Sequence, residues 1–145
     1  MKLRILISGI ALLAIVQTSA QSIIGLTKDE VQVVIKEKHK KLSLDKTIVK
    51  QQFNYLKYVN RSATITYIVY FSENDIATSS KRVCDYAEYD FVLDDLNEQC
   101  EKRGKNKWQY SDDRGTYTVE LAEEEWYFTV RERKKVKGKS IFKRQ

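Results

Sequence analysis

The sequence contains no proline, five glycines, two cysteines and a single histidine in 145 residues. Without proline and with so little glycine, tight turns depend on Asn, Asp and Ser side chains. One histidine and two cysteines are too few for a typical zinc site, which takes three or four His, Cys or acidic ligands. The sequence also has no glycine-rich phosphate-binding loop of the Rossmann or P-loop kind. We therefore expect no metal and no cofactor.

The residues that carry nucleophilic catalysis are equally scarce. His39 lies in the basic run from Lys36 to Lys41, whose ammonium groups disfavour the charged imidazole. A catalytic thiol would have to lie beside His39. Cys100 is expected on the apolar face of a helix instead, where a cysteine is usually inert. We therefore expect a protein that is not an enzyme and has no catalytic residues.

The N-terminus has the three parts of a secretory signal peptide. Lys2 and Arg4 precede an apolar run of 12 residues from Ile5 to Val16, and small residues follow up to Ala20. A bilayer span needs about 20 apolar residues, so the run is short for a membrane anchor. We expect a signal peptide over residues 1–20, cleavage before Gln21, and a periplasmic or secreted mature protein.

The net charge of +6 is unevenly distributed. Residues 131–145 contain eight basic residues and one acidic residue, whereas residues 21–130 contain 16 basic and 19 acidic residues. We expect one folded domain over residues 21–133 and a disordered basic tail over residues 134–145. The cations of this tail are candidates for binding an anionic lipid, a polyanion or another anionic surface: Lys134, Lys135, Lys137, Lys139, Lys143 and Arg144.

Two cysteines in an oxidising compartment raise the question of a disulfide. Cys84 is expected near the end of a strand and Cys100 at the far end of the helix that follows. That helix would separate them by about 20 Å, whereas a disulfide needs Cα atoms about 6 Å apart. An antiparallel return of the helix would shorten the distance between the two cysteines. The sequence therefore does not decide between a disulfide and two free thiols.

The pattern of apolar residues predicts two helices and six strands. Thr27 and Glu30 form a capping box that begins a helix ending at about Lys40. The second helix has Tyr86, Tyr89, Leu93, Leu96 and Cys100 on one face and ends at Gly104. Alternating segments predict three strands after each helix, over residues 47–59, 63–71 and 76–84, and then 105–110, 115–122 and 126–131.

This order is an internal repeat, with units over about residues 25–86 and 87–133. Each unit has one helix followed by three strands. The prediction is an α+β two-layer sandwich, in which one six-stranded antiparallel sheet has both helices on one face.

The segment from Gly25 to Thr27, followed by Val31, resembles the start of the helix in the small SmpA/BamE envelope proteins. The repeated order of a helix and three strands is similar to that of beta-lactamase inhibitor proteins. Both groups act by binding other proteins, and this is the function that the resemblance implies. The chain departs from the envelope proteins because it has no lipid-attachment cysteine near the expected cleavage site. The resemblance carries over no functional residue.

The strand alternation divides the side chains between two faces. One face is expected to meet the helices: Ile65, Tyr67, Val69, Tyr117, Val119, Trp126 and Phe128. The other face contains the predicted partner-binding residues: Thr66, Ile68, Tyr70, Tyr127 and Thr129. These side chains can equally serve as cross-strand pairs that stabilise the sheet.

We therefore predict a protein-binding module for another exported or envelope protein. The alternative is an envelope-associated structural protein held to an anionic surface by its tail. Nucleic acid is not expected as a partner of an exported protein.

Overall fold

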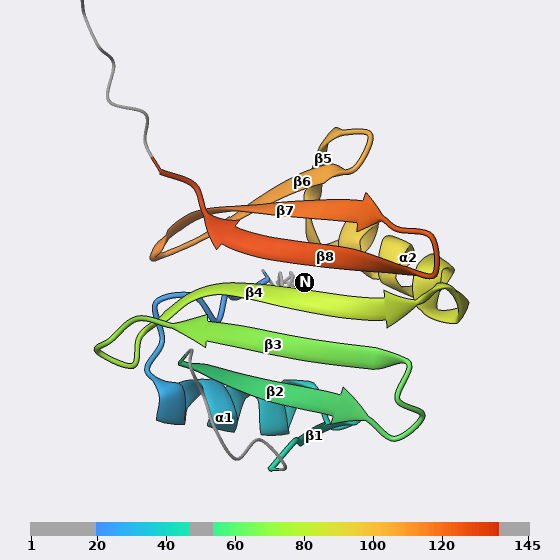
Figure 1. The fold of residues 1–145 in the computed structure, drawn as a ribbon. Helices are drawn as coiled ribbons and strands as arrows, with labels where there is room; N and C mark the ends of the chain where they lie inside the picture. Colours follow the sequence, from blue (N-terminus) through green and yellow to red (C-terminus); the bar gives the residue numbers. More distant parts are fainter. Residues whose placement is uncertain (1–19, 47–53, 137–145) are drawn as a thin grey trace, which may run out of the picture.

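The computed structural model describes residues 20–46 and 54–136. In chain order the elements are α1 (Lys28–Lys38), β1 (Leu42–Leu44), β2 (Tyr55–Asn60), β3 (Ile65–Phe71) and β4 (Ala77–Asp85), then the short 3-10 helix η1 (Tyr86–Glu88), α2 (Tyr89–Gln99), β5 (Glu101–Gly104), β6 (Lys107–Asp112), β7 (Gly115–Glu123) and β8 (Tyr127–Lys134). The chain thus forms an α-helix followed by four strands, and then does so again (Figure 1).

The eight strands of residues 20–46 and 54–136 belong to one antiparallel sheet in the order β1-β2-β3-β4-β8-β7-β6-β5. The order is symmetric about its centre. There β4, the last strand of the first helix-and-four-strand unit, pairs with β8, the last strand of the second unit. The register there joins Lys81 to Arg131 and Cys84 to Phe128. Residues about 50 positions apart in the sequence therefore meet in the middle of the sheet.

The prediction of six strands was wrong, since the sheet has eight. The two additional strands, β1 and β5, are the edges of the sheet, and each follows a helix directly. β1 has only three residues, too few to show an alternating pattern. β5 has the charged sequence EKRG, which we assigned to the end of the second helix, but α2 ends at Gln99. The broader class, α+β with an antiparallel sheet, is confirmed.

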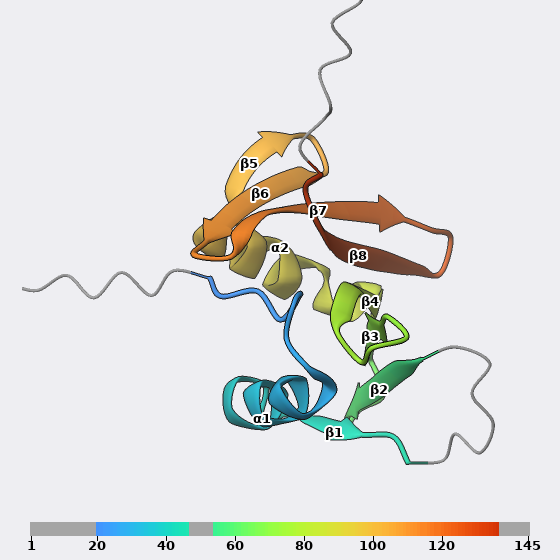
Figure 2. The ribbon, with the colours of Figure 1, turned by 90° about the vertical axis from the view of Figure 1, so that its left-hand side faces the viewer.

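Both helices lie on the same side of the sheet (Figure 2). In the first half, Val31 and Ile35 of α1 pack with Tyr67 and Val69 of β3. In the second half, Val92 and Leu96 of α2 pack against a cluster that contains buried aromatic and aliphatic residues of β6, β7 and β8: Trp108, Val119, Leu121, Phe128 and Val130. Each helix thus covers the sheet of its own half. Neither α1 nor α2 is long and apolar enough to span a membrane.

The start of α1 follows the predicted capping box. The Thr27 side chain accepts a hydrogen bond from the Glu30 backbone, and Glu30 Oε2 accepts one from Thr27 N at 2.8 Å. The hydrogen bonds from Thr27 lower the pKa of the Glu30 carboxyl, since they favour its charged form. His39 is the C-cap, so the helix ends at Lys38, slightly before the expected Lys40.

Trp126 is the one large residue that the alternation placed on the wrong surface. It was expected to face the helices together with Phe128. Instead it lies in the turn between β7 and β8 and is 78% exposed, whereas Phe128 is fully buried. The turn extends one residue beyond Glu125, so the alternation of β8 begins only at Tyr127.

Candidate functional site

The surface of the sheet opposite the helices, called here the helix-free face, contains all the residues predicted to bind a partner. They are Thr66, Ile68 and Tyr70 of β3 and Tyr127 and Thr129 of β8. β4 separates these strands, and its Val83 lies between Thr66 and Thr129 in one cross-strand row. Tyr127 is 42% exposed, but Thr129 is buried at 8% and offers a partner little area.

Basic side chains cross the middle of the helix-free face. One row in register contains Lys57, Ile68, Lys81, Arg131, Glu120 and Lys107. Two of the cations near its ends have acidic partners, since Lys57 pairs with Asp45 at 3.0 Å and Lys107 with Glu120 at 3.8 Å. Arg133 in the neighbouring row also contacts Glu120, at 3.2 Å. Lys57 therefore has a carboxylate of its own, whereas Lys107 and Arg133 share that of Glu120.

The two central cations are not balanced. Lys81 on β4 and Arg131 on β8 lie directly opposite each other. Over residues 20–46 and 54–136, neither has a carboxylate within 4.0 Å. Arg131 also lies opposite Glu120 of β7, but the Glu120 carboxylate contacts Lys107 and Arg133 instead. Opposite residues of an antiparallel pair have Cβ atoms about 5 Å apart, and like charges there destabilise the sheet. A sequence that breaks a local rule in this way often does so at a functional site.

Sequence reasoning missed this pair of cations. The alternation does place Arg131 on the same face as Thr129 and Tyr127, so its orientation was available. The residue opposite Arg131 could not be predicted, because nothing in the sequence shows that β4 and β8 are neighbours. Only the sheet order brings the two charges together at its centre.

The predicted basic tail is described only at its start. Lys135 N donates to Thr116 O at 2.8 Å, and Lys135 Nζ donates to Gln109 Oε1 at 3.1 Å. Lys134 pairs with Tyr117 at the end of β8. The four other cations assigned to the tail lie outside the described residues: Lys137, Lys139, Lys143 and Arg144.

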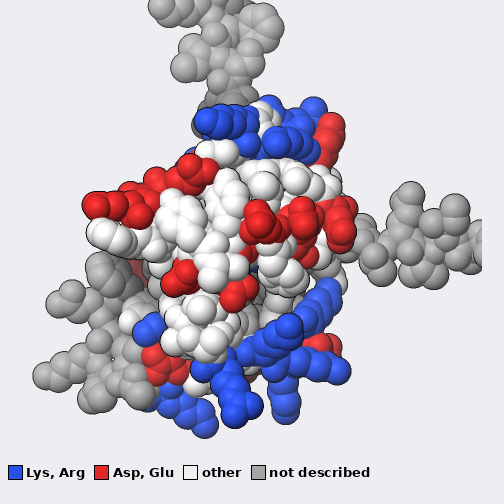
Figure 3. Space-filling view, turned by 90° about the vertical axis from the view of Figure 1, so that its right-hand side faces the viewer, with Lys and Arg blue, Asp and Glu red and all other residues white. Residues whose placement is uncertain are grey.

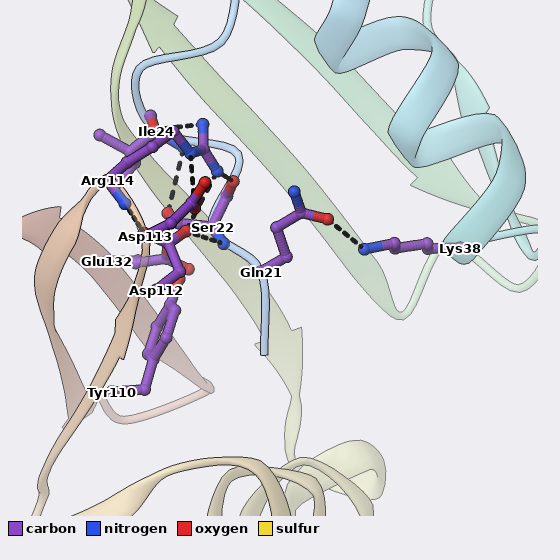
Figure 4. A network of polar contacts seen from close by, with 9 residues as sticks. All are labelled: Gln21, Ser22, Ile24, Lys38, Tyr110, Asp112, Asp113, Arg114 and Glu132. Atoms are coloured by element: carbon purple, nitrogen blue, oxygen red, sulfur yellow. Dashed lines mark hydrogen bonds and ion pairs between the residues drawn. The ribbon is translucent and has the colours of Figure 1, made fainter. Parts of the chain in front are cut away.

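A second group of polar residues holds the N-terminal segment on the helix side of the sheet (Figure 4). Ser22 N donates to Asp112 Oδ2 at 3.2 Å, and Ser22 Oγ donates to Glu132 Oε1 at 2.6 Å. The Arg114 guanidinium donates to the carbonyl oxygens of Ser22 and Ile24. Since Ser22, Ile23 and Ile24 are buried, this segment is part of the core.

The charges in this group are set by their neighbours. Burial opposes ionisation of Asp112, but hydrogen bonds from the backbone N–H groups of Arg114 and Ser22 outweigh it and lower the pKa of the carboxyl. Burial, together with the nearby Glu132 carboxylate, raises the pKa of the Tyr110 hydroxyl, which donates to Glu132. These contacts join the chain before α1 to strands of the second half. Their role is structural.

The residues considered for catalysis or metal binding lie apart in the described part of the chain. No group of three or more His, Cys, Asp or Glu residues there is arranged to hold a metal ion. His39 caps α1 with its ring 6.1 Å from that of Tyr67, whereas both cysteines belong to the core of the second half. Within this part of the chain no hydrogen bond joins His39 to either thiol.

Both cysteines are free in the structure, which leads to a prediction about their reactivity. Burial raises the pKa of the Cys84 and Cys100 thiols to about 11. Because the thiolate is the nucleophile, we expect both to react with a disulfide reagent at least ~100-fold more slowly in the native protein than after denaturation. The measurement is reagent consumption at neutral pH with and without guanidinium, in the absence of reductant. If the denatured chain consumed no reagent, the thiols would be bridged.

Comparison of the chain with family models, with curated proteins and with solved structures finds no match.

Proposed function

We propose that this protein is an exported, non-enzymatic binding module whose helix-free face binds an acidic protein partner. The observation that carries the proposal is the pair of Lys81 and Arg131 at the centre of that face, since neither cation forms an ion pair with any described residue. Carboxylates of a partner would relieve the repulsion between these two cations. Arginine is well suited to this role, because its guanidinium forms two parallel hydrogen bonds with a carboxylate.

The surroundings of the cation pair favour a protein as the partner. Ile68 lies directly opposite Lys81, and Tyr70 lies two residues further along β3, with its ring 6.3 Å from that of Tyr55. Aromatic residues and arginine are enriched in protein interfaces, whereas scattered cations alone would suit any polyanion. The expected signal peptide would bring the module to an exported or envelope protein.

Attachment of the chain to an anionic surface through residues 134–145 is a second candidate function. One observation favours it: the contacts of Lys135 with Thr116 and Gln109 bring the start of the basic segment to the edge of the helix-free face. The cations of the face and of the segment therefore adjoin. Binding of this kind would weaken strongly as ionic strength rises, because exposed charges are screened.

Lys81→Glu separates a binding role of the cation pair from a structural one. The substitution places a carboxylate opposite Arg131, so we expect it to raise the free energy of unfolding by about 0.2–1 kcal/mol. The same change neutralises the pair, and we expect it to weaken capture of an acidic partner at least ~tenfold. The measurements are urea unfolding and capture from the native envelope fraction with the immobilised protein.

The matched control is Lys36→Glu, which reverses an exposed charge on α1, on the helix side of the molecule. It should retain the partner that wild type captures. A partner held equally well by wild type and Lys81→Glu would contradict the proposal. A partner lost only when residues 134–145 are removed would favour surface attachment through the tail.

A further inference from the structure

The turn between β7 and β8 forms a strongly acidic projection at one end of the molecule. Three consecutive acids, Glu123 to Glu125, precede Trp126, and the chain adds Asp85 at the end of β4 and Tyr86 at the start of η1. These residues are called here the acidic tip. No lysine or arginine occurs in residues 85–101 or 115–130. Figure 3 views this end and shows acidic side chains across its middle, between basic ones at the top and the bottom.

Exposed aromatic side chains accompany these acids. Trp126 is 78% exposed and Tyr86 is 40% exposed. The tip is nevertheless ordered by contacts: Tyr86 Oη donates to Glu124 O at 2.6 Å, and Glu124 N donates to Tyr127 O at 2.9 Å. Tyr89 Oη donates to Glu123 Oε1 at 2.8 Å. An exposed tryptophan in a hydrogen-bonded turn, beside the carboxylates of Glu124 and Glu125, has the composition of an interface anchor.

The helix-free face of the same protein is complementary to this tip. It presents Lys81 and Arg131, which form no ion pair within the described residues, next to Ile68 and Tyr70, whereas the tip presents Glu124 and Glu125 next to Trp126. We propose that the acidic tip of one copy docks on the helix-free face of a second copy, with carboxylates on the cation pair and Trp126 against the apolar side chains. This inference rests on the proposed function and names the acidic partner as the protein itself.

The two surfaces cannot satisfy each other within one copy. Asp85 and Tyr127 are paired at the tip end of β4 and β8, and Lys81 and Arg131 follow four residues along the same strands. Four residues of strand separate them by about 14 Å, and hydrogen-bonded strands do not fold back on themselves. Docking of a tip on a face joins two different surfaces, so the contact can repeat along a chain of copies or close into a ring.

The test uses the purified mature protein alone, in sedimentation experiments at low and high salt. We expect the mean mass to rise over a roughly hundredfold range of concentration up to about 1 mM at low salt, and less at high salt, because screening weakens contacts between exposed charges. Two variants each remove one side of the contact: Lys81→Glu with Arg131→Glu on the face, and Glu124→Lys with Glu125→Lys on the tip. Glu123 stays unchanged because it accepts the hydrogen bond from Tyr89.

Each variant alone should self-associate at least ~tenfold more weakly than wild type does. An equimolar mixture should associate again, because the acidic face of one variant then meets the basic tip of the other. The control is Lys36→Glu with Lys40→Glu, which should behave as wild type. The inference is overturned if wild type stays monomeric, or if the two variants associate alone as well as wild type does. A monomeric wild type that still captures an acidic partner through Lys81 overturns the inference and leaves the proposed function standing.

Discussion

Trp108→Ala is expected to lower the free energy of unfolding by about 4 kcal/mol. The Trp108 side chain is 1% exposed in the core of the second half, where it lies opposite Val119 in the sheet and packs with residues of α2. Its indole Nε1 also donates to Asn97 Oδ1 at 2.9 Å. Alanine would leave a large cavity and remove this hydrogen bond. Urea unfolding followed by circular dichroism measures the loss.

The matched control is the other tryptophan of the chain. Trp126 is 78% exposed, so Trp126→Ala should change the free energy of unfolding by less than about 0.5 kcal/mol. The same variant should weaken the self-association proposed for the acidic tip. Equal destabilisation by the two substitutions would mean that Trp126 is buried and that the tip is not exposed.

Arg114→Ala is expected to lower the free energy of unfolding by about 2–3 kcal/mol. Its guanidinium donates to the carbonyl oxygens of Ser22 and Ile24 and contacts Asp112 at 3.1 Å. The Asp112 side chain is only 5% exposed, so the variant would leave a buried carboxylate with fewer donors. Arg103→Ala, which breaks an exposed pair with Glu101, should change the stability by less than about 0.5 kcal/mol.

The effect of Arg114→Ala should depend on pH in a definite direction. The Asp112 pKa is lowered in the folded state, so its stabilising contribution is present above its unfolded pKa of about 4 and is lost as the pH falls through the folded value. The stability difference between wild type and Arg114→Ala should therefore shrink below about pH 4. A difference that stays constant from pH 7 into this acid range would show that the pairing of Asp112 with Arg114 does not contribute.

Local sequence patterns were sufficient where neighbouring residues decide the structure. The capping box of Thr27 and Glu30 marked the start of α1, and the alternation through Ile65 to Phe71 marked β3 and its two faces. The predicted partner-binding residues consequently lie on one face. Patterns failed at the short edge strands β1 and β5 and at Trp126, where three or four residues carry too little periodicity to identify a strand or the end of a turn.

The candidate site depends on contacts that no local pattern contains. The sequence by itself determined which side chains of each strand share a face, because successive residues of a strand point to opposite sides. Only the tertiary structure decided that β4 pairs with β8, so that Lys81 meets Arg131, and that Ser22 reaches Glu132 on a distant strand. The physical reason is that strand order depends on which apolar surfaces pack best over the whole chain, whereas alternation depends only on adjacent residues.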